Sequence, residues 1–375
     1  MAGTTLLRRV VSRGASNAPR HDGLSRYRAP GGWRSLAEFA IESDVMLVLP
    51  TRPARLSAEA LTDRVRGLSA QMIAAENAEK AQGRQVALVV VIQYASNRER
   101  QLAESHGDAL LALDDRHITT VVTSNAGKIA ALNTAFRLAA STVRFVGWVD
   151  DDVELGQDTL VRLLREIQHM PAPAAVGAVK VPYRSPHRTS HALARAKAVM
   201  PSAMNYPHGC AMIVTADVVR RGIPERYASD DGWVCFQLLD PAADDALWRL
   251  HLAPETSVNY VVGGGLRSTL RRLRRQRIGQ LLLMADAPPP VSHCYLHQCL
   301  LNGVSLLPIN LQEVRIDAAT LERCLYSWVH VLSTLLLAGE LALRGLFRLP
   351  LSDIGWGSPR TIDQHVLFVI RRNEK

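Results

Sequence analysis

Three consecutive aspartates, Asp150, Asp151 and Asp152, follow the apolar run 143–149. The run is rich in β-branched and aromatic residues and therefore predicts a buried strand that ends in three carboxylates. The carboxylates repel one another there, and desolvation raises their pKa values unless a cation lies among them. Hard oxygen ligands suit Mg²⁺ or Mn²⁺, which often carry a phosphate as a further ligand. The triplet thus indicates either a metal and phosphate site or a solvated acidic turn that caps the following helix.

Alternation along the strand selects two of the three aspartates as metal ligands. Successive strand side chains point to opposite faces. If the strand geometry continues to Asp152, then Asp150 and Asp152 share a face and Asp151 points away.

Predicted strands and helices alternate along the chain around the triplet. The strands are predicted at 45–49, 86–92, 118–122, 143–149 and 177–182, and the helices at 57–80, 98–113, 129–140 and 159–167. This alternation is typical of an α/β protein with a mostly parallel, doubly wound sheet. Ligands of such sheets bind beyond the carboxyl ends of the strands. Pro50, Thr51, Gln93 and Asp150 all lie at such ends, so we expect them to meet at one edge.

A second motif precedes the triplet, and together they resemble the family 2 glycosyltransferases of the GT-A fold. Gly127-Lys128 is followed by Ala131-Leu132-Asn133 and then by the Asp-x-Asp pattern of residues 150–152. The segment 45–52 is similar to the opening strand of that family, with its Pro-Thr turn. The segment 209–232 is similar to its acceptor side, which ends in an acidic pair. The resemblance covers roughly residues 42–280.

The resemblance implies a metal-dependent, inverting transfer of a sugar from a nucleotide-diphosphate sugar to an acceptor hydroxyl. It implies Mg²⁺ or Mn²⁺ on Asp150 and Asp152. Asp231 is the implied catalytic base, with Asp230 as its alternate or as the group that orients the acceptor. The residues expected to bind the donor are Pro50, Thr51, Gln93, Lys128, Asp150, Asp151, Arg274 and Arg277. We expect a UDP-sugar as donor and a glycan, a lipid-linked molecule or a small molecule as acceptor, in bacterial glycan or glycoconjugate synthesis.

Two motifs depart from the family pattern. The second strand usually ends in Asp-Asp-Gly-Ser, whose Asp contacts the nucleotide base, whereas Gln93-Tyr94-Ala95-Ser96 stands here. Base recognition must therefore differ. The Gln-x-x-Arg-Trp element of processive members is reduced to the arginines of segment 271–277, which argues against polymer synthesis. Those arginines predict a helix that serves as a solvated face, a pyrophosphate clamp or a dock for anionic lipid, and the position in the family favours the clamp.

Composition limits the other functional classes. Of the 375 residues 47% are hydrophobic, which excludes global disorder, and only 5% are aromatic, which argues against stacking on single-stranded nucleic acid. The net charge of +9 suits anionic partners such as nucleotide diphosphates or a membrane surface. We expect a basic flexible tail over 1–34, which is alternatively a transit peptide, a GT-A catalytic domain over 35–265 and a helical region over 266–375.

The C-terminal region predicts a further helix with an apolar stripe over 325–347. Its uncharged run is shorter than the roughly 20 residues that a membrane span needs. The stripe is expected to pack on the catalytic domain, on a second copy in a homodimer, or on the membrane interface. Five cysteines without a C-x-x-C pair fit a reducing cytoplasm, so the expected location is cytoplasmic or peripheral at the inner face of the membrane.

Two other functions fit parts of the sequence. A nucleotidyltransferase that makes nucleotide sugars shares the sheet and the acidic ligands, but it needs a Gly-rich basic loop where this chain has Pro50-Thr51-Arg52-Pro53. A non-enzymatic basic scaffold with a degenerate transferase fold would explain the altered motifs at Gln93 and Arg274. The intact acids at Asp150, Asp152 and Asp231 oppose that second alternative.

Overall fold

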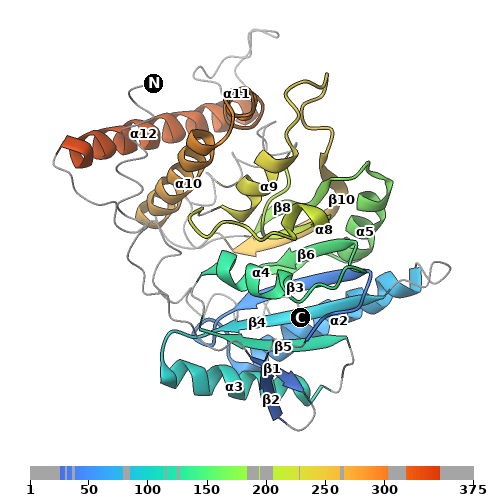
Figure 1. The fold of residues 1–375 in the computed structure, drawn as a ribbon. Helices are drawn as coiled ribbons and strands as arrows, with labels where there is room; N and C mark the ends of the chain where they lie inside the picture. The colour runs from blue at the N-terminus through green and yellow to red at the C-terminus, as the bar shows by residue number, and fades with distance from the viewer. Residues whose placement is uncertain are drawn as a thin grey trace.

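The computed structural model describes residues 26–29, 32–35, 39–78, 85–113, 115, 117–124, 127–183, 194, 206–227, 229–261, 266–302 and 318–346. They form one mixed sheet with helices on both faces and a group of C-terminal helices to one side (Figure 1). The strands are β1 (Arg26–Ala29), β2 (Gly32–Ser35), β3 (Val45–Thr51), β4 (Val86–Gln93), β5 (Ile118–Thr123), β6 (Phe145–Val149), β7 (Val153–Leu155), β8 (Ala175–Tyr183), β9 (Ala211–Thr215) and β10 (Leu250–Val261). The helices are α2 (Ala58–Ala78), α3 (Asn97–Leu111), α4 (Lys128–Phe136), α5 (Thr159–His169), α8 (Ala216–Val219), α9 (Asp230–Leu238), α10 (Leu266–Asp286), α11 (Pro289–Tyr295), the π-helix η3 (Leu296–Leu301) and α12 (Ala318–Leu346).

The sheet confirms the predicted α/β class. Its ten strands follow the order β2-β1-β5-β4-β3-β6-β9-β8-β10-β7. The neighbours β5, β4, β3 and β6 are parallel, so their carboxyl ends lie at one edge. β9 enters antiparallel between β6 and β8, and its first residue, Ala211, pairs with Val149 at the end of β6. The segment that precedes β9 therefore reaches the same edge.

Side chains of β3 alternate between two buried clusters, one on each face of the sheet. Met46 and Val48 pack with α4, α9 and α10, whereas Val45, Leu47 and Leu49 pack with α2, α3 and α5. Burial on both faces explains why the parallel strands are nearly continuous apolar runs.

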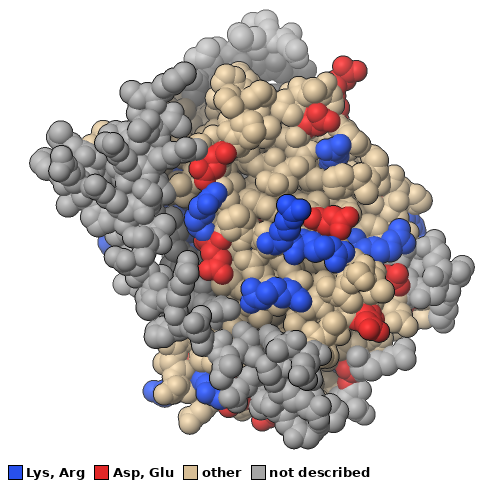
Figure 2. Space-filling view, in the orientation of Figure 1, with Lys and Arg blue, Asp and Glu red and all other residues tan. Residues whose placement is uncertain are grey.

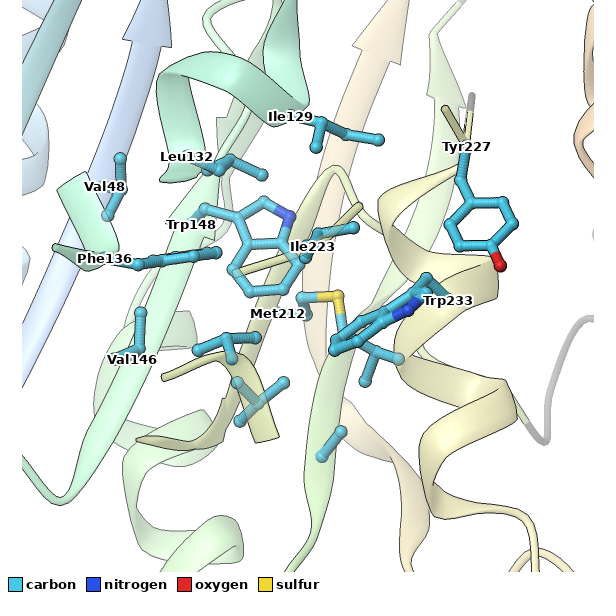
Figure 3. Packing of buried hydrophobic residues seen from close by; sticks show 14 of the residues in the cluster. Val48, Ile129, Leu132, Phe136, Val146, Trp148, Met212, Ile223, Tyr227 and Trp233 are labelled. Carbon is cyan, nitrogen blue, oxygen red and sulfur yellow. The ribbon is translucent and has the colours of Figure 1, made fainter. Parts of the chain in front are cut away.

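The cluster that contains Met46 and Val48 also contains Trp148, which lies two residues before Asp150. Figure 3 shows Trp148 of β6 among side chains of α4, with Trp233 of α9 nearby. The ring centroids of Trp148 and Phe136 are 5.9 Å apart. Ile278 and Leu282 of α10 belong to the same cluster, so the C-terminal helices share the core of the sheet rather than forming one of their own.

The N-terminal segment differs from its expected role as a flexible tail. Residues 26–35 contain the hairpin β1–β2, and β1 pairs with β5 in an antiparallel register. The exposed edge of β5 explains this addition, because an edge strand presents unpaired backbone groups. The remaining residues of the predicted tail, 1–25 and 30–31, lie outside the described residues.

Charged residues are mixed on the face shown in Figure 2. Over its described part, basic and acidic side chains lie side by side instead of forming one continuous basic surface. Nucleic acid would require such a surface. The net positive charge therefore does not make this face a nucleic-acid interface.

Candidate active site

The parallel strands bring the predicted residues to one edge of the sheet. Pro50 and Thr51 end β3, Gln93 ends β4, and Asp150 directly follows β6. Thr51 pairs with Ile92 in the register of the sheet, which places the ends of β3 and β4 side by side. The edge is thus assembled as the sequence predicts.

Gln93 is predicted to bind the donor, and in the structure its amide binds the turn that starts α4. The Gln93 Oε1 atom accepts from the Gly127 N–H at 3.1 Å, and its Nε2 donates to the Gly127 carbonyl at 2.9 Å. Gly127 has a φ of 107°, a conformation that glycine adopts at little cost. Gln93 therefore fixes the turn that directs Lys128.

The strand alternation predicted for the aspartates does not extend to them. β6 ends at Val149, and residues 151–152 form a turn before β7. The carboxylate of Asp151, which is buried, accepts hydrogen bonds from Thr51 Oγ1 and Arg55 Nη1, both at 2.8 Å. Asp151 therefore holds the loop that follows β3, a role that strand alternation does not predict.

Lys128 is predicted at a nucleotide phosphate, but the structure buries it between two carboxylates. Its Nζ lies 2.7 Å from Asp150 Oδ1 and 2.9 Å from Asp230 Oδ2, and it donates to the carbonyl of Gly209. Burial alone would lower the pKa of Lys128, but Asp150 and Asp230 raise that pKa above its ordinary value. This ammonium joins the acidic turn after β6 to the acidic pair of α9.

The surroundings of Asp150 and Asp152 favour the binding of a further cation. Burial raises the pKa of both, although Lys128 lowers that of Asp150 in part, and Asp151 raises that of Asp152 further. Among the described residues, Asp152 has no hydrogen-bond or ion-pair partner. No group of three or more metal-ligating side chains occurs within the described ranges. Proteins often hold Mg²⁺ with two carboxylates and with phosphate oxygens of the substrate. Asp150 and Asp152 fit this ligand set.

The two aspartates that begin α9 have different surroundings, and Asp230 belongs to the interior. It is 6% exposed and accepts a hydrogen bond from Trp148 Nε1 at 2.7 Å in addition to its contact with Lys128. A Cβ atom on Gly209 would lie 2.5 Å from Asp230 Oδ2, so only glycine allows this close approach. Asp230 is thus fully engaged in holding the site together.

Asp231 is partly exposed and is held by hydrogen-bond donors. Its carboxylate accepts from the Gly232 N–H at 2.8 Å, from the Gly209 N–H at 3.2 Å and from the Ser229 hydroxyl. Burial alone would raise the pKa of Asp231, but Lys180 and the Ser229 hydroxyl are the main causes that lower it to about 2. Asp231 is therefore ionised at neutral pH and can accept a proton.

The arginines predicted to clamp the donor lie against α12. Arg274 donates to both carboxylate oxygens of Glu340, at 2.6 and 2.5 Å, and Arg277 contacts His330. Consecutive helix residues point in directions about 100° apart, so the neighbouring Arg275 faces elsewhere. Burial is the main cause that lowers the pKa of Arg275, whereas Asp150 and Asp230 raise it. Arg275 is therefore an arginine of this group on which the acidic site acts.

Asn133 connects the motif that contains Lys128 with the acceptor-side segment, which is far away in the sequence. Its side-chain amide accepts from the Ile223 N–H and donates to the Ile223 carbonyl, both at 2.7 Å. The adjacent Gly222 has a φ of 79°. The helix that carries Lys128 and the acceptor-side segment are thereby fixed to each other.

Three residues of the site are absent from the sequence-based set: Arg55, Trp148 and Lys180. A lysine inside a predicted buried strand is a signal that could have identified Lys180, because a buried charge requires a partner. Trp148 lies two residues before Asp150, on a strand that reaches the site. Arg55 lies in a loop after β3, where no sequence pattern singles it out.

The chain is similar in sequence or fold to several known proteins. Residues 48–221 match the sequence model of glycosyl transferase family 2. A Drosophila beta-1,4-galactosyltransferase 7 mutant in complex with manganese, UDP-Gal and xylobiose is 14% identical, with a TM-score of 0.23 and coverage of 46% of this chain and 50% of that one. A Desulfovibrio desulfuricans protein described as a nucleotide-diphospho-sugar transferase is 12% identical, with a TM-score of 0.29 and coverage of 68% and 98%. No curated protein matches the chain.

Proposed function

From the match of residues 48–221 to the sequence model of glycosyl transferase family 2, we propose that the protein transfers a sugar from a nucleotide-diphosphate sugar to an acceptor hydroxyl. A UDP-sugar is the first donor to consider. The acceptor is a glycan, a lipid-linked molecule or a small molecule. The observation that carries the proposal is the pair of acidic groups, Asp150 with Asp152 and Asp230 with Asp231, on the two sides of the buried Lys128.

The first acidic group supports a role in donor binding. Asp150 and Asp152 would hold Mg²⁺ or Mn²⁺, since both carboxylates are half-buried and this burial raises the pKa of each. When bound there, the metal neutralises negative charge that develops on the departing diphosphate. The bonds from Thr51 and Arg55 to Asp151 keep the adjacent loop in position beside that site. The ion pair with Lys128 keeps Asp150 oriented.

The second acidic group supports a role in acceptor activation. In our proposal the acceptor oxygen attacks the anomeric carbon, its proton passes to the Asp231 carboxylate, and the bond to the diphosphate breaks. A single displacement of this kind inverts the configuration at that carbon. Asp231 suits the role better than Asp230, because Asp230 is buried against Lys128 and Trp148.

A screen of nucleotide sugars tests the proposed activity. The purified full chain is incubated with UDP-, GDP- and dTDP-sugars, with Mn²⁺ or with chelator, and release of the nucleoside diphosphate is measured. We expect slow hydrolysis of at least one donor in the presence of the metal. Absence of both hydrolysis and nucleotide-diphosphate binding across the panel would contradict the proposal.

The metal ligands give a separate prediction. We expect excess chelator to weaken binding of the nucleoside diphosphate by at least about tenfold, since charge-assisted contacts contribute roughly 1.5–3 kcal/mol each. Asp152→Asn should weaken binding similarly and remove the effect of the chelator. Isothermal calorimetry measures both. Asp158→Asn is the matched control, because Asp158 is exposed and a residue with its φ of 57° tolerates asparagine. Equal affinity with and without metal would exclude Asp150 and Asp152 as metal ligands for the donor.

The arginines of α10 give another prediction. We expect Arg275→Gln to weaken binding of the nucleoside diphosphate about tenfold and binding of the nucleoside much less, because its guanidinium lies within the electrostatic influence of Asp150 and Asp230 and would attract a diphosphate bound beside them. Arg274→Gln is the control on the adjacent position. It should leave nucleotide binding within twofold of wild type, because its partner is Glu340. If calorimetry instead shows a larger loss of binding for Arg274→Gln than for Arg275→Gln, Arg274 contacts the diphosphate as the sequence predicts.

A further inference from the structure

The polarity of α12 is inverted with respect to an ordinary surface helix. Its buried side carries Thr320, Cys324, Ser327 and Ser333, together with Leu337. Its exposed side carries large apolar residues at helical spacing, namely Leu321, Leu325, Trp328, Leu332, Leu335, Leu336 and Leu343. A helix of a soluble protein normally buries such a stripe. Here Leu335 remains 65% exposed and Leu336 60%.

Ion pairs and hydrogen bonds hold the polar side of α12 against α10. Arg274 binds Glu340, and Arg277 contacts His330. Figure 1 shows α12 crossing α10 at the margin of the molecule, away from the sheet. The packing therefore fixes which side of α12 faces outward, and that side is apolar.

We propose that the outward face of α12 lies in the interface of a lipid bilayer that contains anionic lipids. Exposed positions of α12 from Leu325 to Leu343 include no charged side chain. A dimeric coiled coil normally flanks its apolar seam with charged residues, so the uncharged flanks favour lipid over a second copy of the chain. The stripe spans the 23 residues from Leu321 to Leu343, about 33 Å between its ends, a length typical of helices that lie in the membrane plane.

The neighbouring charge supports the anionic component. α10 contains six arginines and no acidic residue before Asp286. Arg267 and Arg271 are exposed, and Arg267 lies seven residues before Arg274, on the side of α10 that meets α12. Guanidinium groups beside an apolar face attract anionic headgroups.

The position of α10 favours a helix that lies in the membrane plane over one that crosses the bilayer. Residues 320–343 are long and apolar enough to cross a membrane by length and composition, with a mean hydropathy of 1.3. A crossing helix would carry His330 and Glu340 into the hydrocarbon, together with the α10 arginines that bind them. Charged side chains at that depth are costly.

Sedimentation with vesicles tests the proposal on the full chain without nucleotide, so its result is independent of sugar transfer. We expect the wild type to bind vesicles of phosphatidylcholine with phosphatidylglycerol more strongly than vesicles of phosphatidylcholine alone. The triple variant Leu332→Gln, Leu335→Gln, Leu336→Gln should lower binding at least about tenfold, since it removes three large apolar side chains from the face that enters the lipid. The control Leu102→Gln, Leu111→Gln, which removes exposed leucines from α3, should bind as wild type.

Tryptophan fluorescence and sedimentation velocity separate the outcomes. Vesicles should shift the emission of the wild type to shorter wavelength, and Trp328→Phe should remove most of that shift. Circular dichroism checks that each variant folds. A wild type that ignores vesicles but dimerises through α12 would overturn the proposal in favour of a second copy. A wild type that neither binds vesicles nor dimerises would overturn it as well.

Discussion

We expect Lys128→Met to lower the free energy of unfolding by about 3–5 kcal/mol, the cost of removing one partner from a buried ion pair. The substitution keeps most of the length of the side chain but leaves the half-buried Asp150 and the buried Asp230 without their shared cation. It also removes a donor to the Gly209 carbonyl. Urea unfolding followed by circular dichroism measures the change.

A double variant distinguishes the loss of charge compensation at Asp230 from the loss of packing around Lys128. Asp230→Asn in the Lys128→Met background removes one of the uncompensated carboxylates, and its amide oxygen can still accept from Trp148 Nε1. The double variant should therefore be more stable than Lys128→Met alone. If Lys128→Met costs less than about 1 kcal/mol, or if the effects of the two substitutions simply add, the ion pairs of Lys128 do not stabilise the fold by compensating the two carboxylates.

Asp231→Asn should reduce turnover by at least about a hundredfold, in line with the loss of a general base. Asparagine keeps the shape and can still accept from the amides of Gly209 and Gly232. Folding and metal-dependent donor binding should therefore remain nearly unchanged. Steady-state kinetics with the donor identified by the screen, together with calorimetry, measure both quantities.

Asp230→Asn separates the two members of the pair. Because Asp230 faces Lys128 and Trp148, its substitution should lower stability as well as turnover. If Asp230→Asn abolishes turnover at full stability while Asp231→Asn stays active, the roles within the pair are reversed. If both variants stay active, the acceptor side of the mechanism is wrong.

The strands and the edge that they form could be predicted from the sequence because parallel strands buried on both faces leave a strong apolar signal. β4 was predicted at 86–92 and ends at Gln93, and β6 was predicted at 143–149 and ends at Val149. Strand ends fix the positions of the residues that follow. The family resemblance supplied the order of the motifs, and residues 48–221 bear it out.

The direction of individual side chains could not be predicted in the same way. Lys128 and Asp230 lie on elements far apart in sequence, so no local pattern shows that they form an ion pair. Arg274 and Arg275 are neighbours in one helix, and their partners depend on where α12 packs. Asp151 departs from strand alternation because β6 ends one residue before the triplet. Each of these outcomes is decided by tertiary packing.

The contacts that define the edge also determine when it can form. Thr51 and Asp151 are 100 residues apart, and Trp148 and Asp230 are 82 apart. Such contacts close long loops. The chain loses the entropy of loop closure before the contacts form and stabilise the fold. The edge is therefore expected to form late in folding, after the local helices. A nucleotide that binds it would select completely folded chains and shift the folding equilibrium toward them by mass action.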